Sequence, residues 1–214
     1  MHLSPDSWAV LLQACGVSSA ERVSWSPVLS EVIADDSFSK GPRELPPFLA
    51  NVLHETGRLR RMEESLDYSA KRLREIGLPC APGTRWRRAA LAAEELKHDP
   101  EALAEVLYGG RYGNTQSGDG FRFRGRGPGQ ITFRANYQRV GDIVGQDLEG
   151  VPDLAAQQRF GIEIFLAWWE DKVPDDYIGN AELVRRVVNG GKIGLEDVRL
   201  LTVIIERTLP GLIA

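Results

Sequence analysis

Residues 47–57 read PFLANVLHETG, an apolar run that closes on a histidine, a glutamate and, two positions later, a glycine. The apolar side chains recur at helical spacing, which predicts a helix with a buried face. Gly57 is a typical helix end. The segment therefore predicts that Glu55 presents a carboxylate at the junction between a buried helix and a loop.

The same helical spacing runs through most of the chain, with serine or proline at several expected helix starts. Ser26, for example, is the expected N-cap of a helix that begins at Pro27. The further predicted helices span residues 5–14, 27–33, 69–76, 85–97, 100–107, 152–170, 182–188 and 195–209. Short strands are considered only around Phe121–Arg124. We therefore expect a mainly α fold.

Residues 109–129 break the helical pattern, with eight glycines in twenty-one positions. Such density predicts an irregular loop whose backbone can approach a ligand closely. A flexible linker would hold more serine and fewer aromatic and arginine residues. We interpret the chain as a single catalytic domain over 1–214 with two lobes, the smaller at about 66–115, and a glycine-rich loop lining a cleft. Whether the loop arginines bind an anionic polymer or pack is left open.

The composition excludes several classes of protein. The chain has 214 residues, 43% of them hydrophobic, and a formal net charge of −4. This acidic balance argues against a nucleic-acid partner. Two cysteines, Cys15 and Cys80, predict free thiols rather than a disulfide scaffold. Without a signal-peptide pattern or an apolar run of the roughly 20 residues that span a bilayer, we expect cytoplasmic synthesis and no stable membrane insertion.

Two further carboxylates, Glu63 and Glu64, follow Glu55 closely. A carboxyl group held against apolar surface favours its protonated form, which suits Glu55 to a general acid. On one continuous helix Glu64 would lie about 13 Å further along and face the opposite way. The break at Gly57 lets the chain turn back, and inverting glycosidases hold their carboxyls roughly 6.5–9.5 Å apart. The alternative is an ordinary helix-terminal glutamate followed by a solvated charge run.

A metal site is not expected. His54-Glu55 opens a zinc-protease motif, but the second histidine that this motif needs is replaced by Arg58. The remaining histidines, His2 and His98, lack ligand spacing. We therefore expect no metal and no cofactor.

A third motif, FRGRGPGQIT at 123–132, leads through glycines to hydrogen-bonding side chains. Sugar sites need such groups together with an aromatic face for the pyranose ring. The hydroxyl of Thr132 suits a residue that holds a nucleophilic water. A phosphate-binding loop is excluded because no lysine follows the glycines.

Four motifs in order resemble glycoside hydrolase family 19, the plant-type chitinases and many bacteriophage endolysins. They are HETG at 54–57, ESLDYSA at 64–70, GRGPGQIT at 125–132 with Asn136-Tyr137, and NGG at 189–191. The resemblance implies a lysozyme-like, two-lobed helical fold that needs no metal or cofactor.

The resemblance also implies roles for individual residues. Glu55 would protonate the glycosidic oxygen, Glu64 would activate water for inversion, and Thr132 would orient that water. The neighbouring Glu63 leaves the position of the base open by one residue. The residues implied to line the substrate cleft are His54, Tyr68, Gln130, Asn136, Tyr137 and Asn189.

Within the family the chain resembles the endolysin branch, because Glu64 follows Glu55 by nine residues and extra cysteines are missing. We therefore expect a monomeric endolysin, a lysozyme-like inverting hydrolase of the peptidoglycan glycan strand that acts during host lysis. It would be held in the host cytoplasm and reach the periplasm through a separate holin-type protein. The alternatives are a chitinase acting on β-1,4-linked N-acetylglucosamine polymers and a non-catalytic glycan-binding module.

Overall fold

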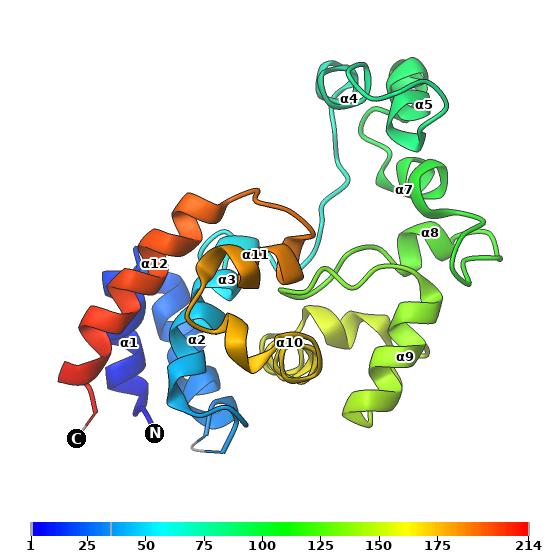
Figure 1. Ribbon diagram of the computed structural model, residues 1–214. Helices are drawn as coiled ribbons and strands as arrows, with labels where there is room; N and C mark the ends of the chain where they lie inside the picture. Colours follow the sequence, from blue (N-terminus) through cyan, green and yellow to red (C-terminus); the bar gives the residue numbers. More distant parts are fainter. Residues whose placement is uncertain (1, 35, 214) are drawn as a thin grey trace. The chain divides into compact units, whose positions relative to one another are not determined.

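The computed structural model describes residues 2–34 and 36–213 and consists mainly of helices (Figure 1). In chain order the α-helices are α1 (Pro5–Ala14), α2 (Ser19–Val32), α3 (Leu45–Glu55), α4 (Ala70–Gly77), α5 (Arg85–Leu91), α6 (Ala93–Leu96), α7 (Pro100–Tyr108), α8 (Asp119–Arg122), α9 (Arg134–Val144), α10 (Gln158–Lys172), α11 (Ala181–Asn189) and α12 (Leu195–Thr208). Short 3-10 turns are η1 (Pro42–Glu44), η2 (Pro152–Ala156), η3 (Asp175–Tyr177) and η4 (Leu209–Gly211). The prediction of a mainly α fold is confirmed.

The chain divides into two compact units. Unit 1 comprises the described parts of Met1–Met62, Gly127–Gly129 and Ala155–Ala214, and unit 2 comprises Glu63–Arg126 and Gln130–Leu154. Glu55 therefore belongs to unit 1 and Glu64 to unit 2. The division into a catalytic domain with a smaller lobe at about 66–115 stays a prediction.

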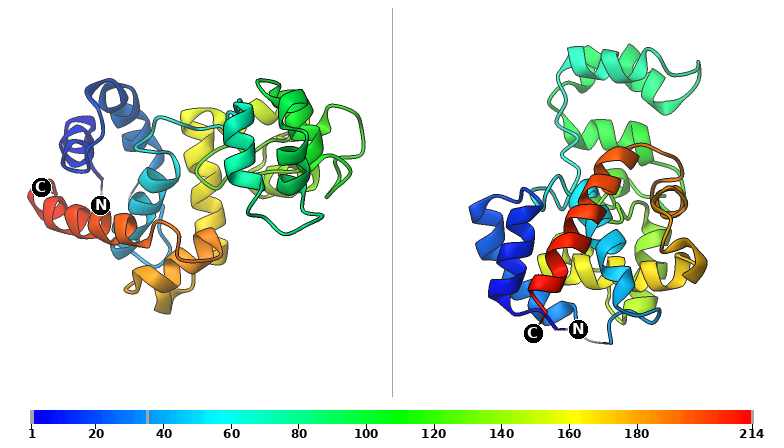
Figure 2. Two further views of the ribbon diagram at one scale, coloured as in Figure 1. Left: turned by 90° about the horizontal axis from the view of Figure 1, so that it is seen from above. Right: turned by 60° about the vertical axis from the view of Figure 1, so that its left-hand side comes forward.

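Unit 1 is built around α3, whose residues Leu45 to Leu53 are all buried. In this unit α12 packs on α3 and on α1, and α1 packs on α2 (Figures 1 and 2). Phe48 of α3 meets Trp169 of α10 edge to face, with ring centroids 5.5 Å apart. Burial on all sides fixes α3, so its last residue, Glu55, sits on a rigid element.

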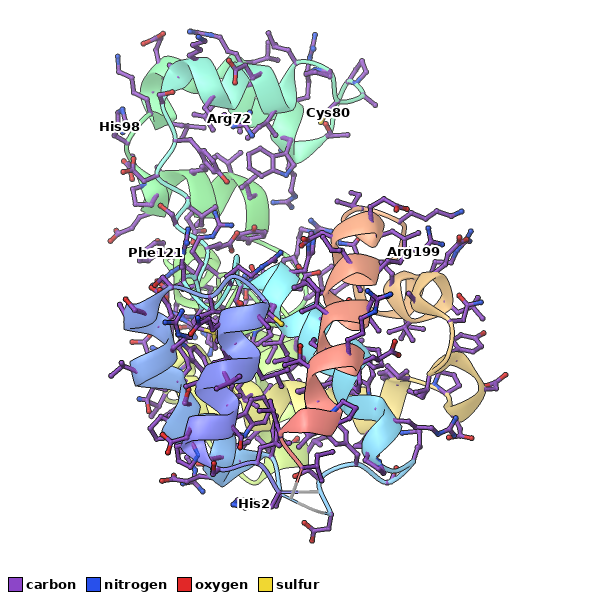
Figure 3. The ribbon with its side chains drawn as sticks, turned by 90° about the vertical axis from the view of Figure 1, so that its left-hand side faces the viewer. His2, Arg72, Cys80, His98, Phe121 and Arg199 are labelled. Atoms are coloured by element: carbon purple, nitrogen blue, oxygen red, sulfur yellow. The ribbon has the colours of Figure 1, made fainter. Side chains whose placement is uncertain are left out.

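Unit 2 has a separate small core beneath α4, α5, α6 and α7. Figure 3 labels Arg72 on α4 and Cys80 just after it. Leucine and alanine side chains form this core, namely Leu66, Leu73, Ala89, Ala93, Leu96, Leu103, Ala104 and Leu107. The thiols of Cys15 and Cys80 are free. In the described part of the chain, no helix has both the length and the apolarity needed to cross a membrane.

Several helix boundaries differ from the predicted ones. Helix α2 begins at Ser19, with Ser18 extended before it, so Ser26 is a buried helix residue and not an N-cap. Pro27 lies inside α2, where the buried side chains of Trp25 and Leu29 hold the helix against the core.

The structure also differs from the prediction in the glycine-rich region and just beyond it. The stretch considered for short strands contains the helical turn α8 instead. Helix α9 is absent from the predicted helices, since its first turn carries the hydrogen-bonding residues Asn136 and Tyr137 of the motif. Residues 85–97 form two helices, α5 and α6, that meet at Ala92.

Candidate functional site

The Glu55 carboxylate ends α3 in unit 1 and is held by an arginine from α11. Arg185 donates from Nη1 to Glu55 Oε1 at 2.5 Å. The arginine is 1% exposed and the glutamate 19% exposed. The pair therefore joins a buried cation to a carboxylate that still reaches solvent.

Arg185 is itself fixed by two further acceptors. Its Nη1 also donates to Asn51 Oδ1 at 3.0 Å, and its Nε donates to the carbonyl oxygen of Ile193 at 2.7 Å. Asn51 and Glu55 are four residues apart and share one face of α3. The surroundings expected for Glu55 were apolar, and this is wrong: the apolar side chains of α3 face the core, while this face meets a guanidinium.

The histidine before Glu55 belongs to a second network, centred on Asp197 of α12. Asp197 Oδ2 lies 2.7 Å from His54 Nδ1, and its Oδ1 accepts from Arg58 Nη2 at 2.6 Å. Hydrogen bonding by Arg58, with a smaller contribution from His54, lowers the pKa of Asp197 to about 2. The carboxylate thus ties the end of α3 to α12.

The chain leaves α3 through three consecutive left-handed residues, Gly57, Arg58 and Leu59, at φ 58°, 66° and 67°. Such backbone is costly outside glycine and persists where the surroundings enforce it. Thr56 Oγ1 accepts from the Leu59 amide at 2.9 Å, and Trp25 Nε1 donates to the Leu59 carbonyl at 3.2 Å. The predicted helix end before Gly57 is confirmed, and the turn after it is closely restrained.

Asn189 is the last residue of α11 and is exposed. Gly190 follows at φ 72° as the helix C-cap. Asn189 lies one helical turn beyond Arg185, so the arginine that binds Glu55 and the predicted sugar-binding asparagine belong to the same helix.

In unit 2 the Glu64 carboxylate is held at both oxygens. The Gly125 amide donates to Oε1 at 2.5 Å, and the Tyr108 hydroxyl donates to Oε2 at 2.9 Å. The backbone of the two segments also pairs, because the Glu64 amide donates to the Gly125 carbonyl at 3.0 Å. Burial, followed by the charge of Glu64, raises the pKa of Tyr108 well above its ordinary value, so its hydroxyl remains a donor.

The neighbouring Glu63 has different partners. Arg124 Nη2 donates to its Oε1 at 2.6 Å, and Arg126 Nε donates to its Oε2 at 2.8 Å. Arg126 is 1% exposed and also binds Asp153 at 2.7 Å. The guanidinium groups of Arg124 and Arg126 therefore neutralise Glu63. These two arginines of the glycine-rich loop have a packing role.

Gly125 leaves the space that this arrangement needs. A Cβ atom there would lie 2.7 Å from Gln130 Oε1 and 3.2 Å from Glu64 Oε1. Gln130 itself has a left-handed backbone, at φ 46°. The glycine thus lets the Gln130 amide and the Glu64 carboxylate approach the same stretch of backbone.

Three further predicted residues of unit 2 donate hydrogen bonds to nearby backbone carbonyls. Thr132 Oγ1 donates to the Gln130 carbonyl at 3.0 Å, and Asn136 Nδ2 donates to the Thr132 carbonyl at 2.8 Å. Tyr137 is fully buried, and its hydroxyl donates to the Arg124 carbonyl at 2.7 Å. Its side chain therefore supports the glycine-rich loop from inside.

Tyr68 packs on the small core of unit 2. Its ring meets that of Trp86 edge to face at 6.0 Å. Its carbonyl accepts from the His98 amide at 3.0 Å. Tyr68 is thereby placed on the surface of the α4–α7 cluster, and a role in sugar binding stays a prediction.

The structure thus gathers the predicted residues into two sets, one in each unit. His54, Glu55 and Asn189 belong to unit 1, and Glu64, Tyr68, Gln130, Thr132, Asn136 and Tyr137 belong to unit 2. Sequence reasoning missed the residues that hold the two carboxylates, namely Arg185, Tyr108 and Gly125. It also missed Asn51, which binds Arg185, and Asp197, which binds His54. Of these, only the Asn51–Glu55 spacing was a usable signal. Within the described residues, no three His, Cys, Asp or Glu side chains are grouped so as to hold a metal ion.

Comparisons with known proteins converge on one family. The profile of the family described as "Chitinase class I" (Glyco_hydro_19) matches residues 103–175. A Haemophilus influenzae protein named "Glycosyl hydrolase family 19 domain-containing protein" is 32% identical over 152 residues, covering 70% of this chain and 72% of the relative. "Acidic endochitinase Q" of Nicotiana tabacum is 38% identical over 73 residues, covering 34% of this chain and 28% of that protein.

Solved structures agree on the fold. Chitinase C from Streptomyces griseus superposes with a TM-score of 0.54 at 19% identity, covering 97% of this chain and 76% of that one. A further bacterial family 19 chitinase gives a TM-score of 0.50 at 20% identity, covering 95% and 94% of the two chains. This similarity shows that the chain has the helical fold of these chitinases.

Proposed function

Because this chain belongs to glycoside hydrolase family 19, and is therefore a glycoside hydrolase, we propose that it cuts the glycan strand of bacterial peptidoglycan by an inverting mechanism. The observation that carries the proposal is that Glu55 and Glu64 are each held by built-in donors. Arg185 binds Glu55, and Tyr108 and Gly125 bind Glu64. Two carboxyl groups in acid and base roles are what inverting hydrolysis of a glycosidic bond needs.

Glu55 is the proposed general acid. Arg185 binds its Oε1, so a proton on Oε2 leaves that bond in place and points to the second oxygen as the donor. The fixed guanidinium also stabilises the carboxylate that forms once the proton has passed to the leaving glycosidic oxygen.

Glu64 is the proposed general base. Its two donors fix the orientation of the carboxylate, while the second lone pair of each oxygen remains to accept a proton from water. Glu63 is less suited to the role because two guanidinium groups occupy its oxygens. Thr132, whose hydroxyl bonds to the Gln130 carbonyl, is proposed to orient the attacking water.

Peptidoglycan is proposed as the substrate because the nine-residue interval between Glu55 and Glu64, and the two free cysteines, match the endolysin branch of the family. In this proposal the protein acts in the periplasm as a monomer, after a separate holin-type protein has released it from the host cytoplasm. Chitin is the second candidate, favoured by the endochitinase among the relatives and by the chitinases among the solved structures.

One experiment separates these readings. The protein is added to Gram-negative cells stripped of their outer membrane, turbidity is followed, and soluble fragments are identified by mass spectrometry. Loss of turbidity with new reducing sugar ends supports a peptidoglycan glycosidase and identifies the bond. Cleavage of soluble chitin oligomers without lysis would transfer the proposal to chitin, and binding without cleavage of either would reduce the protein to a glycan-binding module.

A further inference from the structure

An aromatic cluster in unit 2 reaches from Glu64 to an exposed surface. Tyr108, which binds Glu64, meets the ring of Phe133 edge to face at 5.5 Å. Phe133 in turn meets Tyr112 at 4.9 Å, and Tyr112 is 63% exposed. The guanidinium of Arg111 lies over both outer rings, 5.1 Å from Tyr112 and 5.3 Å from Phe133.

The two outer rings of the cluster, Tyr112 and Phe133, belong to residues whose backbone conformation is unfavourable. Tyr112 has φ 40° and Phe133 has φ 75°. A bulky residue in this region is a conformational outlier, and such outliers cluster at ligand-binding sites. Glycine would adopt either conformation without strain, so the presence of two aromatic side chains calls for a compensating gain.

Packing inside unit 2 explains how the rings are kept in place, but not why one is exposed. The buried Asn114 donates from Nδ2 to the Tyr108 carbonyl at 3.2 Å and accepts from the Arg134 amide at 2.8 Å. The Tyr112 carbonyl accepts from the Ala135 amide at 3.0 Å. The loop that carries Tyr112 is thus pinned to the first turn of α9, which gives the ring a fixed position before any ligand binds.

We propose that Tyr112, supported by Phe133 and Arg111, is a stacking platform for a pyranose ring of the glycan next to the position served by Glu64. An exposed tyrosine presents a flat apolar face and a polar edge, and sugar rings have a matching apolar face bordered by hydroxyl groups. The cluster is continuous with Tyr108, so a strand resting on Tyr112 extends from the unit 2 carboxylate. This inference rests on the proposed function, because it presupposes a glycan substrate.

The test measures binding in the Glu55→Gln background, where cleavage is blocked. Soluble peptidoglycan strands freed of stem peptides, and the N-acetylglucosamine hexamer, are titrated calorimetrically into this parent and into the same protein carrying Tyr112→Ala. Aromatic contacts of this kind imply a roughly 3- to 10-fold rise in Kd for whichever probe the parent binds. Tyr112→Trp should keep the Kd near that of the parent, because it retains an aromatic face.

The matched control is Leu91→Ala, which removes a 71% exposed side chain of unit 2 on α5, outside the aromatic cluster. Its Kd should equal that of the parent. An unchanged Kd in Tyr112→Ala, with a parent that binds, overturns the platform alone. A parent that binds neither glycan overturns the platform together with the proposed function. Thermal melting of each variant checks that the fold is kept.

Discussion

Glu63 and Glu64 are adjacent in the chain, yet their carboxylates meet opposite chemistry. Glu63 is 36% exposed and lies between the guanidinium groups of Arg124 and Arg126. Glu64 receives one neutral hydroxyl and one backbone amide. A carboxylate with two cations is suited to hold a loop, whereas one with two neutral donors is oriented without being neutralised, which is what a base requires.

Exchanging each glutamate for glutamine should separate these roles. Glu64→Gln cannot accept the proton of water and should lower kcat by about 10²–10⁴-fold, with a melting temperature close to that of the parent. Glu63→Gln leaves the buried Arg126 with one anionic partner fewer. It should cost about 1–2 kcal/mol, reduced from the value for a buried pair because Glu63 is partly exposed. Initial rates and melting curves of both variants measure the difference, and the opposite ranking of rates would assign the base to Glu63.

The hydroxyl of Tyr108 is predicted to position the Glu64 carboxylate, and this role can be tested without disturbing the packing of the Tyr108 ring. Tyr108→Phe removes the hydroxyl but keeps the ring against Phe133, so the fold should survive. A hydrogen bond to a charged group is worth roughly 1.5–3 kcal/mol, which implies a fall in kcat of about 10- to 100-fold with little change in KM. An unaltered kcat would limit Tyr108 to packing.

At the scale of elements, sequence periodicity predicts helices correctly where their apolar faces are regular. It fails where tertiary packing overrides the local pattern. Helix α1 has the predicted bounds, because propensity, burial and capping by Ser4 agree there. Pro27 is the predicted start of a helix, but burial of the neighbouring Trp25 and Leu29 carries α2 through it. The carboxylates of Glu55 and Glu64 could be predicted as candidate site residues from local sequence motifs.

The groups that hold these carboxylates, and the carboxylate that holds His54, could not be predicted, since they come from distant segments. Arg185 is 130 residues from Glu55, and Asp197 is 143 residues from His54. No local spacing encodes such pairs. Tyr108 likewise stands 44 residues from Glu64 and carries no motif of its own.

The tie between α3 and α12 should make stability sensitive to acid. The pKa of Asp197 is about 2, below its ordinary value of 3.8, because Arg58 and His54 bind the ionised form. Its contribution is therefore complete above about pH 4 and is lost as pH falls toward 2. Allowing for its exposure, the effect is about 1–2 kcal/mol. In urea titrations Asp197→Asn should be less stable than the parent at pH 5, and the difference should shrink at pH 2. A constant difference would contradict the assignment.

At the scale of the whole molecule, the chain passes between its units at residues 62–63, 126–127, 129–130 and 154–155. The cores differ in kind. The core of unit 1 includes the large buried rings of Trp8, Phe48 and Trp169. The buried side chains of the α4–α7 core of unit 2 are leucine and alanine, and aromatic rings are only partly buried around them. Burial of apolar area contributes roughly 25 cal/mol per Å², so the α4–α7 cluster should open at a lower free energy.

Native-state hydrogen exchange read by mass spectrometry tests this difference. Peptides from α4, α5 and α7 should lose protection at lower urea concentrations than peptides from α3 and α12. Leu103→Ala, which removes a fully buried side chain of unit 2, should cost about 2–5 kcal/mol and speed exchange there while peptides of α3 keep their protection. Loss of protection in both units at one urea concentration would instead mean that they unfold as a single cooperative body. With separate unfolding, Glu64, the proposed base, and Tyr112, the proposed platform, belong to the less stable unit. This agrees with the tendency of binding elements to come from the low-stability end of a fold.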